Sequence, residues 1–131
     1  MEFEGKVAIV TGASGEIGRA TARAFARAGA SLVLVDVDDV RLRETAELAA
    51  RERSGAHIEI SVADVSRSDD VRGFVDLASR SFGRVDILFN NAGIEGSFAE
   101  LAECPEEVFD HVFGINVRGV FLGLRHVLPI M

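Results

Sequence analysis

The sequence predicts an α/β protein built on a doubly wound parallel sheet. Short apolar runs rich in β-branched residues alternate with amphipathic helical stretches over most of the 131 residues, in the order strand, helix, strand, helix. No internal repeat or linker interrupts this alternation, so residues 1–131 are expected to form a single domain. A polar residue closes or follows each of the four runs, which places candidate ligand-binding groups at the carboxyl ends of the strands.

The first strand and the turn after it form the centre of the predicted site. Residues 7–10 are an uninterrupted apolar run, which suits a central strand covered on both faces. The small residues at 12–15 allow backbone N–H groups to approach a ligand closely, and helical periodicity begins at Ile17. The positive end of a helix dipole therefore points at the turn. This arrangement fits a dinucleotide pyrophosphate, and a purely structural turn is the alternative.

The second strand, residues 31–36, completes a βαβ unit and ends in Asp36. This carboxylate lies 18 residues beyond Gly18, near the spacing expected for the acid that hydrogen-bonds a dinucleotide ribose. Its negative charge would repel a 2′-phosphate, so the expected cofactor is NAD rather than NADP. The alternative role for Asp36 is that of a turn residue beside Asp38 and Asp39.

The middle of the chain continues the same pattern. A helix with one apolar side is expected over residues 39–53, and residues 57–62 alternate as a half-exposed strand near a sheet edge should. Asp64 follows as a candidate ligand group or a helix-start residue. The next helix is expected over residues 69–82, and the fourth strand, residues 85–89, leads into the sequence NNAG.

The last helix is expected to begin at Pro105, after a loop over residues 94–104. Apolar residues ring this helix, so we expect it to be buried on more than one side. Gly119 and Gly123 are expected to allow close packing against another helix. Asn116 lies within the apolar helix, where a satisfied core amide is the alternative to a role in chemistry.

Composition argues against several classes of function. The net charge is −7 and the 14 basic residues are scattered among 21 acidic ones, so no nucleic-acid partner is expected. The single Cys104 allows no intramolecular disulfide and has no metal-ligand spacing, so we expect a cytoplasmic protein without a metal site. No signal-peptide core or uninterrupted apolar span is present, so no membrane partner is expected.

Together these motifs resemble the short-chain dehydrogenase/reductase family over the whole chain from Lys6. The resemblance implies a Rossmann-like sheet that binds a dinucleotide, and hydride transfer between a nicotinamide ring and an alcohol or carbonyl substrate. It assigns cofactor contacts to the turn TGASGEIG, to Asp36 as the NAD-selecting acid, to Asp64 and Val65 beside the adenine, and to NNAG. It also makes Asn116 the helix asparagine that supports a proton-relay water. The cofactor-binding residues that it implies are Gly12, Ser14, Gly15, Glu16, Ile17, Gly18, Asp36, Asp64, Val65, Asn90, Ala92 and Gly93.

One departure from the family pattern is Glu16, which stands where the family places a glycine. A carboxylate at contact range would repel a pyrophosphate by about 1 to 4 kcal/mol, depending on the local dielectric. Gly15 is one candidate to replace the missing glycine in part. The other alternative is that Glu16 points to solvent and costs little.

The second departure concerns catalysis. The resemblance implies that the family's catalytic serine and Tyr-x-x-x-Lys pair lie beyond the point where this chain stops. The chain has no tyrosine, and its only lysine, Lys6, precedes the first strand. Asn116 cannot titrate to replace them, and His111, His126 and Cys104 are better explained as structural residues. The chain alone is therefore expected to be inactive or nearly so, as the cofactor-binding N-terminal half of such an enzyme, either a truncated reading frame or an engineered fragment.

In such a half the fourth strand would lack an outer neighbour. The sheet is therefore expected to be incomplete at its C-terminal side, and the apolar edge to promote a homo-oligomer. A nucleotide-binding module without chemistry is the main alternative function. A receiver-like signalling domain would explain the acidic cluster of Asp36, Asp38 and Asp39, but it leaves the glycine turn unexplained.

Overall fold

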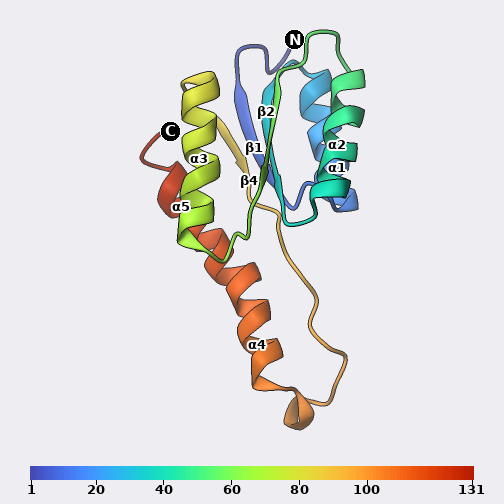
Figure 1. Cartoon of the computed structure of the whole chain (residues 1–131), viewed down its shortest axis with the longest axis vertical. Helices are drawn as coiled ribbons and strands as arrows, with labels where there is room; N and C mark the ends of the chain where they lie inside the picture. The colour runs from blue at the N-terminus through green and yellow to red at the C-terminus, as the bar shows by residue number, and fades with distance from the viewer.

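The computed structural model describes all 131 residues and confirms the predicted parallel sheet (Figure 1). Its four strands are β1 (Val7–Thr11), β2 (Ser31–Asp36), β3 (Ile58–Val62) and β4 (Ile87–Phe89). They pair in parallel in the order β3-β2-β1-β4, so β3 is an edge strand, as its alternating sequence predicts. The strand order reverses between β1 and β4, which places a crevice at their carboxyl ends.

Helices cover both faces of the sheet. Two of them, α1 (Glu16–Arg27) and α2 (Asp39–Arg51), lie together on one face, and α3 (Ser68–Phe82) and α5 (Gly119–Val127) lie on the other (Figure 1). The first three of these helices begin within one residue of the predicted positions, whereas α5 begins at Gly119, inside the stretch predicted as one helix from Pro105. The chain therefore has the doubly wound, Rossmann-like architecture expected of an alternating strand and helix sequence.

Two apolar layers hold this architecture together, because successive strand side chains point to opposite faces. On one face Ile9, Val33 and Val35 are buried against α3 and α5, with Phe74 fully buried among them. On the other face the alternate residues of β1 and β2 pack against α1 and α2; they are Ala8, Val10, Leu32 and Leu34. Both faces of β1 and β2 are thus buried, which accounts for their continuous apolar sequence.

The C-terminal helical region departs from the prediction of one uniform helix. It consists of α4 (Glu106–Phe113), a π-helical segment over Gly114–Arg118, and α5, and it follows a loop with a short 3₁₀ turn at Leu101–Glu103. In Figure 1, α4 and this loop extend beyond the carboxyl end of the sheet. The π-helical segment therefore lies where the helix passes from the body of the protein to this extension.

The prediction that the last helix is buried on more than one side is wrong for this chain. Large apolar side chains form a continuous exposed row along one side of α4 and α5, which we call the apolar stripe. Its members are 45–60% exposed and are Phe109, Phe113, Val117, Phe121, Leu124 and Leu128. The rings of Phe109 and Phe113 stack with centroids 4.4 Å apart. The helix faces only one layer of protein, through Leu122 and Val127, so its opposite side has no cover.

The two glycines of this helix allow close packing, but not against another helix. A Cβ at Gly119 would lie 2.7 Å from Val65 Cγ2, and a Cβ at Gly123 would lie 2.8 Å from Asn90 Nδ2. The glycines therefore let α5 approach the segments that leave β3 and β4 at the carboxyl edge of the sheet. None of the helices combines the length and apolar character that a bilayer span requires.

Candidate functional site

Two adjoining cavities open at the carboxyl ends of the strands. The first, of about 110 Å³, is mainly apolar, and the second, of about 460 Å³, lies over the turn between β1 and α1. We call them the apolar cavity and the glycine cavity. Gly12, Asp36 and Gly93 line both, so the two form one continuous crevice.

The turn after β1 depends on the absence of a side chain at Gly12. Its φ is +66°, in the left-handed region that favours glycine. A Cβ at this position would also lie 2.9 Å from both Ala92 Cα and Asn91 Nδ2. Gly12 therefore allows the β1 turn and the segment after β4 to meet, and this contact forms the floor of the crevice.

Gly18 has a packing role in the same turn. A Cβ there would collide with the carbonyl oxygen of Gly12 and lie 2.8 Å from its carbonyl carbon. The first turn of α1 thus rests directly on the β1 turn. Gly15, by contrast, has an ordinary φ of −75°, and a Cβ there would meet only one atom, at 3.5 Å. Gly12 and Gly18 are required by the fold, whereas Gly15 keeps the surface of the turn open.

The N-terminus of α1 offers unpaired donors to the glycine cavity. Gly15 is the N-cap, and no side chain caps the helix, so the first N–H groups have neither an intrahelical nor a side-chain acceptor. Glu16, Ile17 and Gly18, the first three helical residues, all line the cavity. N–H groups at the positive end of a helix dipole favour an anionic ligand such as a phosphate.

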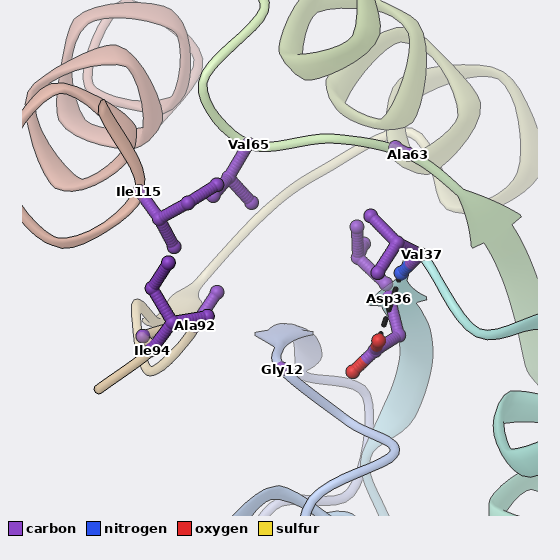
Figure 2. Close-up of a pocket in the computed structure, with 10 residues that line it drawn as sticks. Gly12, Asp36, Val37, Ala63, Val65, Ala92, Ile94 and Ile115 are labelled. Atoms are coloured by element: carbon purple, nitrogen blue, oxygen red, sulfur yellow. Dashed lines mark hydrogen bonds between the residues drawn. The ribbon is translucent and has the colours of Figure 1, made fainter. Parts of the chain in front are cut away.

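Asp36 is held in one orientation by three backbone donors. Its Oδ2 accepts a 2.9 Å hydrogen bond from Ser14 N–H, and its Oδ1 accepts from the N–H groups of Val37 at 2.8 Å and Asp38 at 3.2 Å. Figure 2 shows the carboxylate on the wall of the apolar cavity, across from Ile94 and Ala92. Carboxylate oxygens have further acceptor capacity, so Asp36 can receive hydroxyl hydrogens from a ligand in the crevice.

The β1 turn and the NNAG segment are tied together by Thr11. Its buried Oγ1 accepts hydrogen bonds from Asn91 N–H at 3.0 Å and Ala92 N–H at 3.1 Å. The Asn91 side chain donates in return to the carbonyl oxygen of Thr11 at 3.1 Å. These bonds fix Ala92 and Gly93 at the junction of the two cavities.

The apolar cavity is a slot between two walls. Figure 2 places Val37 and Ala63 on one side and Val65, Ile115, Ala92 and Ile94 on the other. Val35 also contributes. A flat, largely apolar group such as a purine ring fits walls of this chemistry, which present few polar atoms and no charge besides Asp36.

Four of the predicted site residues do not line either cavity. Ser14 is buried in the turn and contributes its N–H to Asp36, and Asn90 donates from Nδ2 to Val120 carbonyl oxygen at 2.9 Å. Asp64 faces its own loop, where Oδ1 accepts from Ser66 Oγ at 2.6 Å. This bond lowers the pKa of Asp64 against the opposing effect of partial burial.

Asn116 is the fourth residue outside the cavities. Its Oδ1 accepts from Ile94 N–H at 2.8 Å, and its Nδ2 donates to Ile94 carbonyl oxygen at 2.9 Å. The amide therefore satisfies both backbone groups of Ile94, a wall residue of the apolar cavity. Asn116 lies in the π-helical segment, so this local change of helix geometry presents its amide to the loop.

Few titratable side chains line the crevice. Asp36 and Glu16 are the only titratable groups among the residues that line the two cavities. Lys6 precedes β1 and pairs with Asp86 at 3.5 Å, at the amino end of the sheet. His126 is bonded to Ser68 Oγ, 3.1 Å away, between α5 and α3.

Several lining residues are not in the predicted set. All are apolar except Asn91, and they are Val35, Val37, Ala63, Asn91, Ile94 and Ile115. Their positions beside Asp36, Asp64 and NNAG were a usable signal for all except Ile115. That residue comes from a distant helix and enters the site only through the tertiary fold.

Comparison with known proteins agrees with this geometry. A family model described as short chain dehydrogenase matches residues 6–131. Levodione reductase from Leifsonia aquatica is 42% identical over 98% of this chain and 48% of its own length. A structure of NAD⁺-bound xylitol dehydrogenase is 39% identical with a TM-score of 0.95, over 100% of this chain and 50% of that one. A metagenomic short-chain oxidoreductase in complex with NADP is 33% identical with a TM-score of 0.93, over 100% of this chain and 58% of that one.

The chain spans about half the length of the curated relatives it matches. The family model nevertheless matches almost every residue present, from before β1 to the end of the chain. The similarity to the xylitol dehydrogenase structure covers the whole of this chain, including the β1 turn, the sheet and the last helix. The chain belongs to the short chain dehydrogenase family.

Proposed function

We propose that this chain binds NAD as the cofactor-binding half of an oxidoreductase that acts on an alcohol or carbonyl substrate. The adenine would occupy the apolar cavity, the ribose hydroxyls would bond to Asp36, and the pyrophosphate would lie over the N-terminus of α1. The observation that carries the proposal is the continuity of these three environments through Gly12 and Asp36. Their order matches the order of base, sugar and phosphate in the ligand.

The preference for NAD over NADP rests on charge. Asp36 lies at the junction of the cavities, and no arginine or lysine lines either of them. A 2′-phosphate would bring about −1.5 to −2 charges next to this carboxylate without a cation to offset them. Ribose hydroxyls would instead donate hydrogen bonds to it.

The bound cofactor would supply a hydride donor or acceptor at its nicotinamide ring. The residues of this chain would bind and orient it: Gly12 and Gly18 by leaving room, Ser14 by holding Asp36, and Asn116 by holding Ile94. None of them is placed to deliver a proton to a substrate oxygen, as an acid–base catalyst must. We therefore expect binding by this chain without turnover.

A nucleotide-binding module without chemistry is the second candidate, and the absence of an acid–base group from the crevice favours it. The free thiol of Cys104 is compatible with a reducing compartment such as the cytoplasm. The exposed apolar stripe favours a homo-oligomer over a monomer.

Two measurements test these proposals. Titration calorimetry with NAD, NADP and adenosine should show saturable binding of NAD and weaker binding of NADP. Incubation with NAD and a panel of secondary alcohols, followed at the absorbance of reduced nicotinamide, should show no turnover. Absence of NAD binding at millimolar concentration would refute the binding proposal. Steady reduction of NAD would refute the expectation that the chain alone is inactive.

A further inference from the structure

Glu16 lines the glycine cavity, and no lysine or arginine lines that cavity with it. Glu16 is exposed, is the first residue of α1 and lines the cavity together with Asp36. The nearest cation on the same helix face is Arg19, one turn further on. The Arg19 side chain instead contacts α2, where it donates a 3.0 Å hydrogen bond to Thr45 Oγ1 and forms a 3.3 Å ion pair with Glu44.

The hydrogen-bond donors around Glu16 in the glycine cavity are backbone N–H groups and the Asn91 amide, and none of them is a charged side chain. The other residues that line the glycine cavity are glycines, Ile17, Asp36 and Asn91. The attraction for a phosphate therefore comes from N–H groups and the helix dipole, equivalent to about half an elementary charge. One full negative charge beside them is large on this scale, so it must alter which anions the cavity accepts.

We infer that Glu16 is a specificity-determining residue, which admits the internal pyrophosphate of a dinucleotide and disfavours nucleotides that end in a free phosphate. This inference rests on the proposed function. Each phosphate of a pyrophosphate diester carries one negative charge, whereas a terminal phosphate carries about −1.5 to −2 at neutral pH. Repulsion by Glu16 rises with ligand charge, so ADP is penalised more than NAD.

The size of the effect follows from Coulomb's law. For a full unit of additional ligand charge about 4 Å from a carboxylate in solvent-like surroundings, the dissociation constant rises about fivefold. Salt weakens the effect, because the Debye length falls to about 3 Å at 1 M. A ligand that reaches only the apolar cavity, such as adenosine, should not respond to Glu16.

The test compares Glu16→Gln with wild type by titration calorimetry at low salt, with EDTA present to keep ADP free of divalent metal. Glu16→Gln keeps the shape of the side chain and removes its charge. ADP should bind more tightly to the variant, and the gain for ADP should exceed the gain for NAD by up to about fivefold. The affinity for adenosine should not change, and both gains should shrink in 1 M salt.

Glu47→Gln is the matched control, because Glu47 is exposed on α2, does not line either cavity, and gives the same change in net charge. The melting temperature of ligand-free Glu16→Gln should fall slightly, since an acid in the first turn stabilises a helix. Tighter binding of ADP to Glu16→Gln could therefore not be attributed to a more stable ligand-free protein. Equal gains for ADP, NAD and adenosine, or the same gains in Glu47→Gln, would overturn the inference. Failure of both wild type and Glu16→Gln to bind NAD would instead overturn the proposed function.

Discussion

The backbone N–H of Ser14 lies 2.9 Å from Asp36 Oδ2 and donates a hydrogen bond to it, which joins the turn after β1 to the end of β2. The same carboxylate accepts from Val37 and Asp38, so it fixes the geometry of two segments. Replacing it with alanine should lower the free energy of unfolding by about 1 to 2 kcal/mol, because three donors lose a charged acceptor. It should also weaken NAD binding about tenfold and reduce the preference for NAD over NADP.

Chemical denaturation and titration calorimetry measure the two effects separately. Asp39→Ala is the control, because Asp39 is exposed and pairs only with Arg43, four residues along α2, at 3.0 Å. An exposed helical pair of this kind contributes about 0.3 to 0.5 kcal/mol, and Asp39 lines neither cavity. If Asp36→Ala bound NAD as tightly as Asp39→Ala does, Asp36 would not be the ribose acceptor.

Gly18 and Gly73 should respond to alanine substitution with opposite signs. A Cβ at Gly18 would strike the backbone of Gly12, so Gly18→Ala should cost about 1 to 3 kcal/mol by displacing the first turn of α1. Gly73 lies exposed within α3 with no atom near the position of a Cβ, so Gly73→Ala should stabilise the protein by about 0.5 to 1 kcal/mol. Urea denaturation of both variants checks the signs. A neutral Gly18→Ala would contradict the close contact between the two turns.

The sheet was predictable because its information is local. The β-branched runs of β1 and β2 and the helical periodicities between them specify buried strands and covering helices without reference to distant residues. The glycine turn and Asp36 were predictable for the same reason, since a fixed spacing along the chain becomes a fixed geometry in a βαβ unit. Even the edge position of β3 follows from its alternating side chains.

The position of a residue at the end of a strand did not predict which way its side chain points. Asp64 and Asn90 lie at the correct edge of the sheet, yet Asp64 bonds to Ser66 and Asn90 to Val120 instead of facing the crevice. A strand end fixes where a residue lies, while local acceptors and donors decide where its side chain points. The wall residue Ile115 was not identified because the π-helical segment and the fold bring it to the crevice.

The exposure of the last helix also could not be predicted from its apolar residues. Periodicity shows which sides of a helix are apolar, but not how many of them meet another layer. In this structure only the side bearing Leu122 and Val127 does so.

Acid should destabilise the protein through Asp86. Its carboxylate bonds to the guanidinium of Arg84 and to Val7 N–H, and the Arg84 bonds contribute most to lowering the pKa to about 2. Because the folded-state pKa lies below the unfolded value of 3.8, this stabilisation is present above about pH 4 and is lost as the pH falls toward 2. Asp86→Asn should cost about 1 kcal/mol at neutral pH, a modest value because Lys6 and Arg84 are exposed and screened by solvent.

Urea denaturation at pH 7, 5, 4 and 3 tests this prediction. The difference between wild type and Asp86→Asn should be constant from pH 7 to 5 and should shrink from pH 4 downward. Asp76→Asn is the control, since Asp76 is exposed on α3 and its carboxylate forms no ion pair. A wild-type to Asp86→Asn difference that stays the same down to pH 3 would show that Asp86 is not held ionised by its partners.

The apolar stripe should make the protein self-associate. Phe113 and Phe121 are half-exposed at its centre, and a contiguous apolar row of this length on α4 and α5 marks an interaction surface. Acidic residues flank its first half, at Glu106 and Glu107, while Arg125 lies near its other end, so an antiparallel partner helix would pair opposite charges.

Sedimentation velocity should detect a dimer or larger species of the wild type at high micromolar concentration. The double variant Phe113→Glu, Phe121→Glu should be monomeric, because two buried carboxylates would oppose association. Leu101→Glu alters an apolar residue outside the stripe that is more exposed than Phe113 and Phe121, and it should leave association unchanged. A monomeric wild type, or dissociation by Leu101→Glu to the same extent, would exclude the stripe as the contact surface.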